Sequence, residues 1–454
     1  MPEPRTITEA AEFIRKGELT PVELLDQCLA RIDRYEPKVR AWVIVDREGA
    51  REQAERLTAE LKAGQNRGPL HGIPIGVKDI IDVFDLPTGC GSKLWANSYA
   101  RRDATVVERL RQAGAIIMGK TVTTAFASFD PPVTRNPWNL ERTPGGSSSG
   151  SAAAVACGMC LGALATQTGG SITRPASYCG VYGLKPTYGR VSVDGVMPLA
   201  PSMDHVGVMA NCVRDLAILF QTIAGPDARR ASLFREADPI PDVLAAIDRP
   251  ARDDDLSPDI CALGGLFVDL LAEDVRPHYD AVTSEIQSHV GLLDRMIPPA
   301  GFSEVLKAHR LVMAVESAAY HEQRFRRHPE DYPPNILALL EEGLSRPAVA
   351  YRMARVFRDD LDEQITRMLG KARFFLTPAT TSAPPAAATT GDPAFNSPWS
   401  FTGHPTISLP YTFTAEGLPL AVQLVAPPRL EDDLFSAALG LERALGFTPR
   451  PLPL

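Results

Sequence analysis

Two glycine–serine turns lie close together in this chain and flank a run of small apolar residues. The first turn is Gly145–Gly150, with the sequence GGSSSG, and the second is Thr168–Ser171, with the sequence TGGS. Glycine adopts backbone conformations that a β-carbon forbids, and it lets the backbone approach a ligand closely. The segment between the turns includes Ala152–Cys157, in which no side chain is larger than valine. The pattern predicts a tightly packed helix between two turns that build a site from backbone N–H groups and hydroxyls.

The bulk composition limits the partners and the compartment. The chain has 454 residues, 44% hydrophobic and 22% charged, which is ordinary for a globular protein with a large core. Its net charge of −8 argues against nucleic acid as a partner, because duplex binding normally needs a basic face. No apolar stretch is long enough to cross a membrane, and the N-terminal sequence lacks the apolar segment of a signal peptide. We expect a cytoplasmic protein whose seven scattered cysteines are reduced.

The pattern of apolar runs predicts an α/β architecture. Short apolar runs alternate with helical segments from residue 72 onward, as expected for a buried sheet between helical layers. The expected strands are 41–45, 73–77, 115–118, 207–209, 374–376, 406–410 and 418–425. The expected helices are two within 7–36 and single ones at 47–63, 105–113, 152–157, 213–224 and 431–445.

No internal repeat and no clear linker divides the chain, so residues 1–454 are interpreted as one domain. Its signature core is expected at about 68–220, and C-terminal strands and a helix at 372–454 complete that core. Between them, residues 226–371 are expected to form a variable helical insertion. This insertion begins with a polar surface excursion at 226–260, and Glu341–Gly343 separates two long helices within it.

Three polar residues are candidates for nucleophilic catalysis. Lys78 ends an apolar strand, and a buried lysine has a lowered pKa that lets its neutral amine act as a base. Ser147 and Ser171 lie in the two glycine turns, and a serine becomes a strong nucleophile only when a neighbouring base takes its proton. The three side chains are sufficient for a relay in which the lysine deprotonates one serine through the other. Such a relay is typical of acyl transfer.

Four motifs resemble those of the amidase signature family in order and spacing: Gly72–Asp79, Gly145–Ser151, Thr168–Ser171 and Pro175–Gly189. The resemblance is close over residues 68–220 and returns more weakly at 376–378 and 417–423. It implies the amidase-signature fold, which is an α/β fold with a large mixed twisted sheet sandwiched between helical layers and a helical insertion. It also implies a small-molecule amide substrate, no cofactor and no metal.

The resemblance further implies a role for each residue of the two turns. In the Ser–cis-Ser–Lys triad of this family, Ser171 is the nucleophile, Ser147 the bridging serine and Lys78 the base. A cis peptide bond is implied between Gly146 and Ser147. The implied oxyanion hole consists of the N–H groups of Thr168, Gly169, Gly170 and Ser171.

Three departures from the commonest family pattern are similar to a malonamidase-like branch. Ala125 replaces an acid that many members have, and Gln167 replaces the usual aspartate before Thr168. Arg174 lies three residues after the nucleophile, where two is usual. In that branch the arginine binds a substrate carboxylate, a role that suits the bidentate guanidinium. We therefore predict that Arg174 binds a small amide that carries a carboxylate.

Several other segments match known motifs, but the surrounding sequence does not support the function that each motif indicates. Gly146–Gly150 matches the G-x-S-x-G elbow that would make Ser148 a nucleophile, but no apolar strand precedes it, so Ser148 is expected to contact substrate or backbone. Gly114–Thr121 matches a phosphate-binding loop, yet its middle residues read as a strand. The pair Cys157 and Cys160 lacks a second pair, so zinc is not expected. His205 and His404 have no evident acid partner for a Ser-His-Asp triad.

Three functions fit these features to different degrees. The favoured one is a stand-alone amidohydrolase, expected to be a homodimer. The alternative is an amidotransferase A-type subunit that supplies ammonia to a partner complex, but Ala125 and Gln167 count against it. The third is a silent binding protein with the same fold, and the intact Lys–Ser–Ser set argues against it. The acyl and amine portions of the substrate are expected to be selected by residues 272–371 and 391–404.

Overall fold

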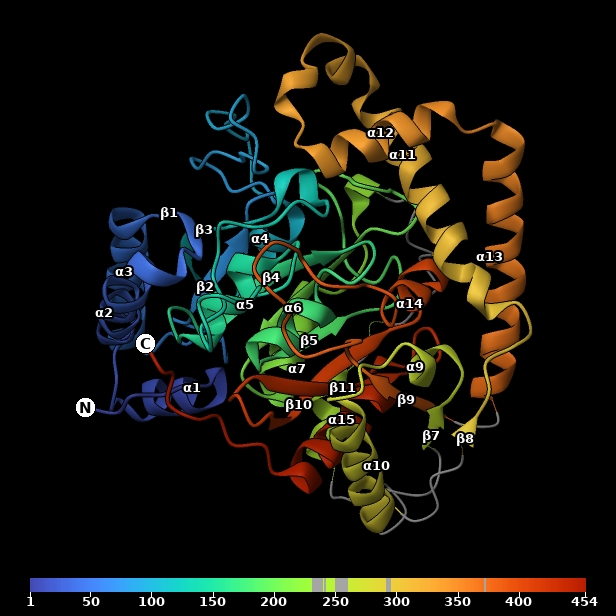
Figure 1. Ribbon diagram of the computed structural model, residues 1–454. Coiled ribbons are helices and arrows are strands. Elements are labelled where there is room, and N and C mark those ends of the chain that lie inside the picture. Colours follow the sequence, from blue (N-terminus) through green and yellow to red (C-terminus); the bar gives the residue numbers. More distant parts are fainter. Residues whose placement is uncertain (231–239, 241, 250–259, 291–294, 371–372) are drawn as a thin grey trace.

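A computed structural model of the chain describes residues 1–230, 240, 242–249, 260–290, 295–370 and 373–454. A mixed eleven-stranded sheet runs through these residues in the order β1-β3-β2-β4-β6-β5-β10-β11-β9-β7-β8 (Figure 1). Strand β2 is parallel to β3 and β4, and β7 is parallel to β8 and β9, whereas the other neighbours are antiparallel. The strands are β1 (Trp42–Val45), β2 (Pro74–Lys78), β3 (Ile116–Thr121), β4 (Gly162–Gln167), β5 (Tyr182–Lys185), β6 (His205–Ala210), β7 (Ile260–Leu263), β8 (Arg295–Met296), β9 (Phe374–Pro378), β10 (Thr406–Phe413) and β11 (Pro419–Val425).

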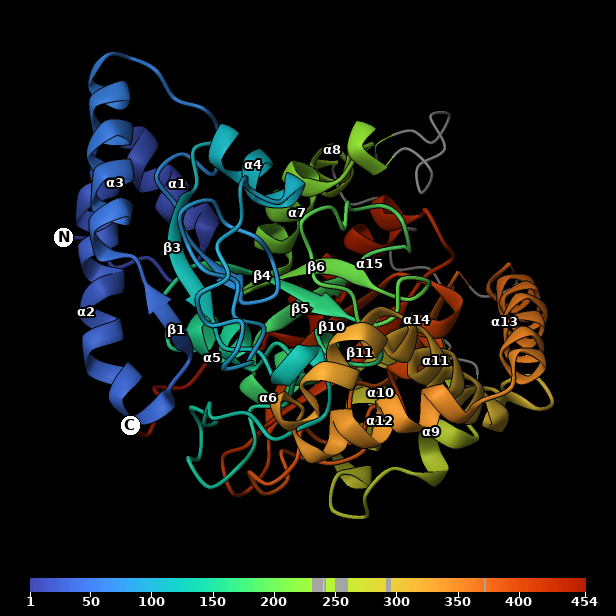
Figure 2. The same cartoon turned by 90° about the horizontal axis from the view of Figure 1, so that it is seen from above.

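Helices cover both faces of this sheet, which confirms the predicted layered fold. Figure 2 shows α5 (Ser149–Ala156) and α6 (Thr173–Cys179) on one side, and α7 (Val213–Ile223) and α15 (Glu431–Leu445) on the other. A hydrophobic core lies on each side of the sheet, and strand β4 contributes to both of them. Leu164 points into one core, and Ala163 and Ala165 point into the other. The alanine face packs with the alanines of α5, so small side chains bring this helix close to the sheet, as the sequence predicted.

The N-terminal helices are α1 (Ile7–Lys16), α2 (Pro21–Val39) and α3 (Arg47–Lys62), and α2 and α3 pack against each other beside the β1 edge (Figure 1). Helices α1 and α2 each begin with a capping box, formed by Thr6 with Glu9 and by Thr20 with Glu23. The remaining helices are α4 (Thr105–Gln112), α8 (Val243–Asp248), α9 (Leu266–Asp269), α10 (Arg276–Val290), α11 (Val305–Arg327), α12 (Pro334–Ser345), α13 (Ala348–Leu369) and α14 (Ser397–Thr402). Short 3-10 turns are η1 (Ala125–Ala127), η2 (Ala228–Arg230), η3 (Phe302–Glu304) and η4 (Pro329–Asp331).

The predicted insertion is only partly helical. Helices α11, α12 and α13 form the group at the upper right of Figure 1, as expected. Strands β7 and β8, however, lie within 226–371 and extend the sheet beyond β9. Most of the predicted surface excursion at 226–260 lies outside the described residues.

The sequence predicted a break between two long helices at Glu341–Gly343, and this prediction is wrong. Gly343 lies inside α12, and the chain turns after Ser345. A β-carbon at Gly343 would lie 2.0 Å from the carbonyl oxygen of Ala314 in α11. Glycine therefore serves the close packing of α11 on α12 rather than a turn.

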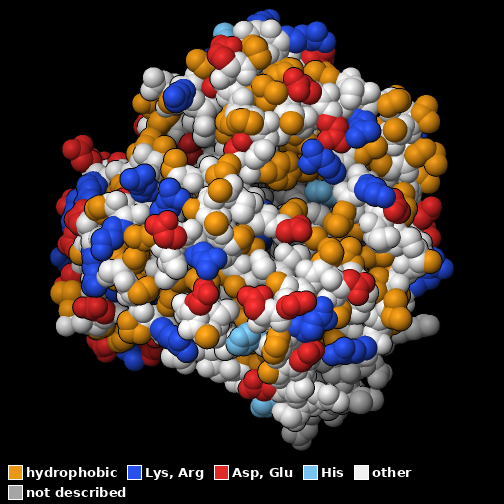
Figure 3. Space-filling view, viewed as in Figure 1, with side chains coloured by type: hydrophobic (Ala, Val, Ile, Leu, Met, Phe, Trp, Pro, Cys, Tyr) orange, Lys and Arg blue, Asp and Glu red, His pale blue; other side chains and the backbone are white. Residues whose placement is uncertain are grey.

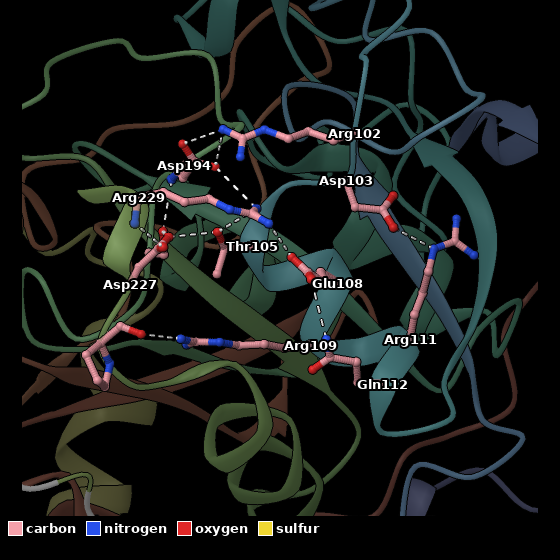
Figure 4. A network of polar contacts seen from close by, with 12 residues as sticks. Arg102, Asp103, Thr105, Glu108, Arg109, Arg111, Gln112, Asp194, Asp227 and Arg229 are labelled. Atoms are coloured by element: carbon pink, nitrogen blue, oxygen red, sulfur yellow. Dashed lines mark hydrogen bonds and ion pairs between the residues drawn. The ribbon is translucent and has the colours of Figure 1, made fainter. Parts of the chain in front are cut away.

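A polar network joins α4 to segments that follow β5 and α7 (Figure 4). The Thr105 hydroxyl donates to Asp227 at 2.7 Å, and Arg229 donates to Glu108 at 2.7 Å. Arg109 donates to the carbonyl of Ile223 at 2.7 Å, which satisfies a group that the end of α7 leaves unpaired. These contacts hold the end of α7 against the sheet-covering helix α4.

The segment that matched a phosphate-binding loop is strand β3, as the sequence predicted. Lys120 within it is buried and forms an ion pair of 3.0 Å with Asp79, next to Lys78. Burial raises the pKa of Asp79, and the Lys120 ammonium opposes that shift. Lys120 also donates to the Thr88 hydroxyl at 3.0 Å, so this lysine has a structural role.

Replacing Lys120 by methionine tests this role. Lys120→Met leaves the buried Asp79 carboxylate without its partner, so we expect the free energy of unfolding in urea to fall by about 3–5 kcal/mol. The double variant Lys120→Met with Asp79→Asn removes both charges and should recover part of that loss. A single variant as stable as the wild type would contradict the structural role.

Candidate active site

The structure brings Lys78 and Ser147 into direct contact. Lys78 is the last residue of β2, and Ser147 follows a cis peptide bond after Gly146. The Nζ atom of Lys78 donates to Oγ of Ser147 at 2.7 Å, and both side chains are buried. Ser171 follows β4, which is parallel to β2 and adjacent to it, so both strands end at the same edge of the sheet. Ser171 is 9% exposed, against 0% for Lys78 and 1% for Ser147, so it is the most accessible of the three.

Thr166 is a further contact of the lysine that the sequence did not reveal. Its Oγ1 atom accepts a hydrogen bond from Lys78 Nζ at 2.7 Å. Thr166 lies on β4, a strand of mostly small residues that the apolar pattern did not indicate. Once β4 is known, its pairing with β2 places Thr166 beside the end of β2. The Lys78 amine is thus held between two hydroxyl groups.

The surroundings of Lys78 favour its neutral form. Burial lowers its pKa well below the ordinary lysine value, and the nearby Asp204 carboxylate opposes this shift. Asp204 accepts hydrogen bonds from the Thr168 hydroxyl and from the N–H group of Leu199, and burial raises its own pKa. A neutral amine next to a serine hydroxyl is chemically able to accept a proton from it.

The segment from Thr168 to Ser171 carries backbone donors without partners. None of the four N–H groups donates to another of the described residues. A β-carbon at Gly170 would lie 2.6 Å from Oδ1 of Asn396 and 3.0 Å from Nη1 of Arg174, so a larger residue there would displace these side chains. Adjacent unpaired N–H groups beside a serine form an arrangement that can bind an oxyanion.

Gln167 links this loop to two helices. Its Oε1 atom accepts the N–H groups of Ile172 and Thr173 at 2.8 and 3.0 Å, at the start of α6. Its Nε2 atom donates to the hydroxyl of Ser400 in α14 at 3.1 Å. An aspartate at this position has acceptors only, so it could not donate a hydrogen bond to Ser400 as the Gln167 amide does.

Arg174 lies in α6 between the two glycine turns. Its Nη2 atom donates to the carbonyl of Gly146 at 2.8 Å and to the hydroxyl of Thr390 at 3.3 Å. Its Nε and Nη1 atoms are buried and have no hydrogen-bond partner among the described residues. Burial lowers the pKa of the guanidinium. Nη1 therefore lies beside Gly170, 3.0 Å from where a β-carbon of that residue would be, and has no acceptor among the described residues.

Ser148 makes the second of its two expected contacts, with the backbone. Its hydroxyl accepts the N–H group of Thr166 at 3.3 Å and donates to the Thr166 carbonyl at 3.2 Å. The side chain is fully buried, so it joins the start of α5 to β4. Its contact with substrate stays a prediction, and the two backbone bonds favour a structural role.

The other candidate groups have structural surroundings. His205 is buried, with Nδ1 at 2.6 Å from the carbonyl of Met203. Within the part of the chain that the structure describes, no group of three or more His, Cys, Asp or Glu residues could hold a metal ion. None of the seven cysteines forms a disulfide. No helix of the described residues has the length and apolar character needed to cross a bilayer.

The molecular surface is hollowed near the middle of the face shown in Figure 3. This hollow lies below α11 and α12 and above α6, and hydrophobic side chains gather along its rim. Helix α6 follows Ser171, and His309 of α11 contacts Thr168, so the second glycine turn lies next to a helix of the insertion.

Known proteins resemble this chain over most of its length. The profile that describes the family named Amidase matches residues 23–435. The chain belongs to the amidase family. Membership places it among hydrolases that act on amide C–N bonds, and it confirms the resemblance that the motifs indicated.

Individual relatives differ in what they do. The chain is 48% identical over 255 residues to the A-type subunit of the glutamyl-tRNA(Gln) amidotransferase of Roseiflexus sp., a match that spans 54% of this chain and about half, 51%, of that relative. It is 34% identical to AmiD of Mycobacterium tuberculosis, named as an amidase, over 99% of this chain and 96% of that protein. The peptide amidase of Stenotrophomonas maltophilia has a TM-score of 0.84 at 27% identity, over 99% of both chains. These likenesses confirm the predicted fold class, and they include both proteins named as amidases and the A subunit of an amidotransferase.

The pKa of Lys78 should set the pH dependence of catalysis. Protonation of Lys78 removes the base, so kcat/KM should fall as pH falls through a pKa well below 10.5. The Asp204 carboxylate raises that pKa, so Asp204→Asn should move the acid limb of the profile to lower pH. His309 and His404 have pKa values lowered by burial to about 4 and about 3, so neither should titrate near neutrality. A limb that stays in place or moves to higher pH in Asp204→Asn would contradict the assignment.

Proposed function

We propose that this member of the amidase family is a stand-alone amidohydrolase with Ser171 as its nucleophile. The hydrogen bond of 2.7 Å between Lys78 and Ser147 is the observation that carries the proposal. It joins a buried amine of lowered pKa to a hydroxyl, beside a loop that presents a more exposed serine. A lysine with only a structural role is expected to pair with a carboxylate or to extend to solvent, and not to be buried against a serine hydroxyl.

The first half of the proposed reaction forms an ester with the enzyme. Oγ of Ser171 attacks the amide carbonyl, its proton passes to Ser147, and the Ser147 proton passes to Nζ of Lys78. The negative oxygen of the tetrahedral intermediate accepts hydrogen bonds from the unpaired N–H groups of Thr168–Ser171. In comparable enzymes each such donor contributes about 3 kcal/mol to catalysis. The relay then returns a proton to the nitrogen, the C–N bond breaks, and ammonia or an amine leaves.

The second half releases the acid. Water attacks the acyl group on Ser171 and gives up a proton through Ser147 to Lys78. Collapse of this second intermediate breaks the ester bond and returns a proton to Oγ of Ser171. The same relay serves both halves because the two steps are chemically the reverse of each other. The net reaction consumes one amide and one water and yields a carboxylic acid and an amine.

We further propose that the substrate is a small amide with a carboxylate and that the chain falls in the malonamidase-like branch. Two donors of Arg174, Nε and Nη1, have no partner among the described residues, and Nη1 lies next to Gly170, which supports this proposal. A carboxylate there pairs with a buried positive charge through charge-assisted hydrogen bonds.

The single-domain organisation, the homodimer and the cytoplasmic location remain proposals from the sequence. Light scattering on the purified protein tests the homodimer, and a monomer would exclude it.

Ser171→Ala removes the proposed nucleophile. We expect the rate of amide hydrolysis to fall by about 10⁴-fold or more, because the relay then has no nucleophile to activate. A fluorophosphonate should label the wild type at Ser171 and leave the variant unlabelled. Ser177→Ala is the matched control, since this buried serine lies in the adjacent helix α6 and, among the described residues, its hydroxyl bonds to that of Thr380, at 3.5 Å. Wild-type turnover by Ser171→Ala would refute the triad.

Arg174→Lys separates substrate binding from support of the first glycine turn. Lysine keeps the charge but lacks the planar pair of donors. For monoamides of dicarboxylic acids, we expect kcat/KM to fall by about 10- to 100-fold, since each charged hydrogen bond contributes about 1.5–3 kcal/mol. Neutral amides of the same length should lose much less. An equal loss on both would show that Arg174 acts only through its bond to Gly146.

The identity to the Roseiflexus amidotransferase favours one second candidate. In that alternative the same triad releases ammonia for a partner complex. Co-purification with a small partner chain, and transfer of ammonia to a misacylated tRNA, would support it. Release of free ammonia from an amide by the purified chain alone, at a rate unaffected by partners, would favour the hydrolase.

A further inference from the structure

Two carbonyl groups of the nucleophile loop are held by side chains from outside the signature core. The Nε2 atom of His309 lies 2.8 Å from the carbonyl oxygen of Thr168. The hydroxyl of Ser400 donates to the carbonyl oxygen of Gly169 at 2.7 Å. His309 belongs to α11 in the insertion, and Ser400 belongs to α14 in the C-terminal part. The loop that carries the unpaired N–H groups is therefore braced by two distant segments.

Peptide planarity connects these bonds to the donors. The carbonyl of Thr168 and the N–H of Gly169 are parts of one planar peptide group, so fixing one orients the other. The carbonyl of Gly169 and the N–H of Gly170 form the next peptide group in the same way. Glycine has the most freely rotating backbone of any residue. Hydrogen bonds from outside the loop therefore restrict the backbone rotation of Gly169 and Gly170 more than they would that of other residues.

Each brace is itself held in place. His309 is 4% exposed, and burial lowers its pKa to about 4, so the ring is neutral and its Nε2 must carry the proton that it donates to a carbonyl. Its ring lies 6.2 Å from that of Phe401, the neighbour of Ser400 in α14. Ser400 accepts a hydrogen bond from Gln167, which gives its hydroxyl a defined direction toward Gly169.

We propose that His309 and Ser400 are positioning residues that orient the Gly169 and Gly170 N–H groups of the oxyanion hole. Helices α11 and α14 contact each other, so they act on adjacent peptide groups as one unit. Through them, the segments outside the signature core set the geometry of the catalytic loop. This inference rests on the proposed function, because it assigns an origin to the donor geometry that the proposed reaction uses.

The test removes each donor while the packing is kept. His309→Phe retains a buried ring without an N–H group, and Ser400→Ala removes one hydroxyl. Because the bracing bonds act on the transition state, kcat should fall by about 10- to 100-fold in each variant while KM stays within a few-fold. His309→Gln, whose amide can still donate, and Ser400→Thr should each recover most of the rate.

A fluorophosphonate gives a second readout that does not depend on the identity of the substrate. Its phosphonyl oxygen requires the same donors when Ser171 attacks, so the labelling rate constant should fall in parallel with kcat. His321→Ala is the matched control, because this buried histidine of α11 bonds to the Tyr332 hydroxyl and not to the loop. The control should label at the wild-type rate, and the acid limb of the pH profile should not move in any variant.

The outcomes separate the two proposals. Failure of the wild type to label at Ser171 would overturn the proposed function. A wild type that labels, together with His309→Phe and Ser400→Ala variants that label and turn over at its rate, would overturn the bracing role alone. A loss shared by His321→Ala and not rescued by glutamine or threonine would mean that these residues only stabilise the fold, and it would overturn the bracing role as well.

Discussion

The burial of Lys78 is the constraint on which the rest of this structure depends. An amine at the end of a central strand, closed off from water, is tolerated only when it is neutral or well partnered. The Ser147 and Thr166 hydroxyls supply partners without supplying charge, and both are brought to it by strands or turns of the same sheet edge. The carboxylate that follows Lys78 in the chain, Asp79, is paired with Lys120 instead. One lysine of this edge is thus paired as an ion, and the other, Lys78, is held by hydroxyl groups in surroundings that favour its neutral form.

Small side chains make that arrangement geometrically possible. The alanines of α5 pack on Ala163 and Ala165 of β4. The first glycine turn, which precedes α5, and the Thr168–Ser171 loop, which follows β4, lie at the same end of this contact, where Ser148 bonds to Thr166. Larger residues there would move the turns apart, because helix-to-sheet distance follows side-chain volume. Around this compact centre, Arg174 reaches from α6 to the first turn, and His309 and Ser400 reach in from α11 and α14. The Thr168–Ser171 loop therefore receives contacts from the core, the insertion and the C-terminal part.

Prediction from sequence succeeded where apolar periodicity was strong. The two N-terminal helices, strands β2 and β3 and helix α15 were located within a few residues of their observed bounds. It missed β4, β5 and α6, because their glycines, alanines and hydroxyl residues carry little periodic signal although they are fully buried. It also assigned Ile260–Leu263 to a helical insertion, since a run of four apolar residues does not distinguish a sheet-edge strand from part of a helix. The prediction of a helix break at Gly343 failed for a similar reason, because the sequence does not show that helix α11 packs closely against this glycine.

The sequence alone determined the candidate chemistry. Lys78, Ser147 and Ser171 in their motifs, with Arg174 displaced by one residue, were sufficient to indicate the family and the residues of interest, because those signals are local in the chain. Only the tertiary structure decided how these groups meet. Thr166, Asp204, His309 and Ser400 act through contacts between residues far apart in sequence, and their residue types carry no pattern of their own. The structure also shows that the hydroxyl of Ser148 bonds to the backbone of β4. The physical reason is that pKa values, donor directions and burial belong to a three-dimensional environment, which neighbouring residues in sequence do not specify.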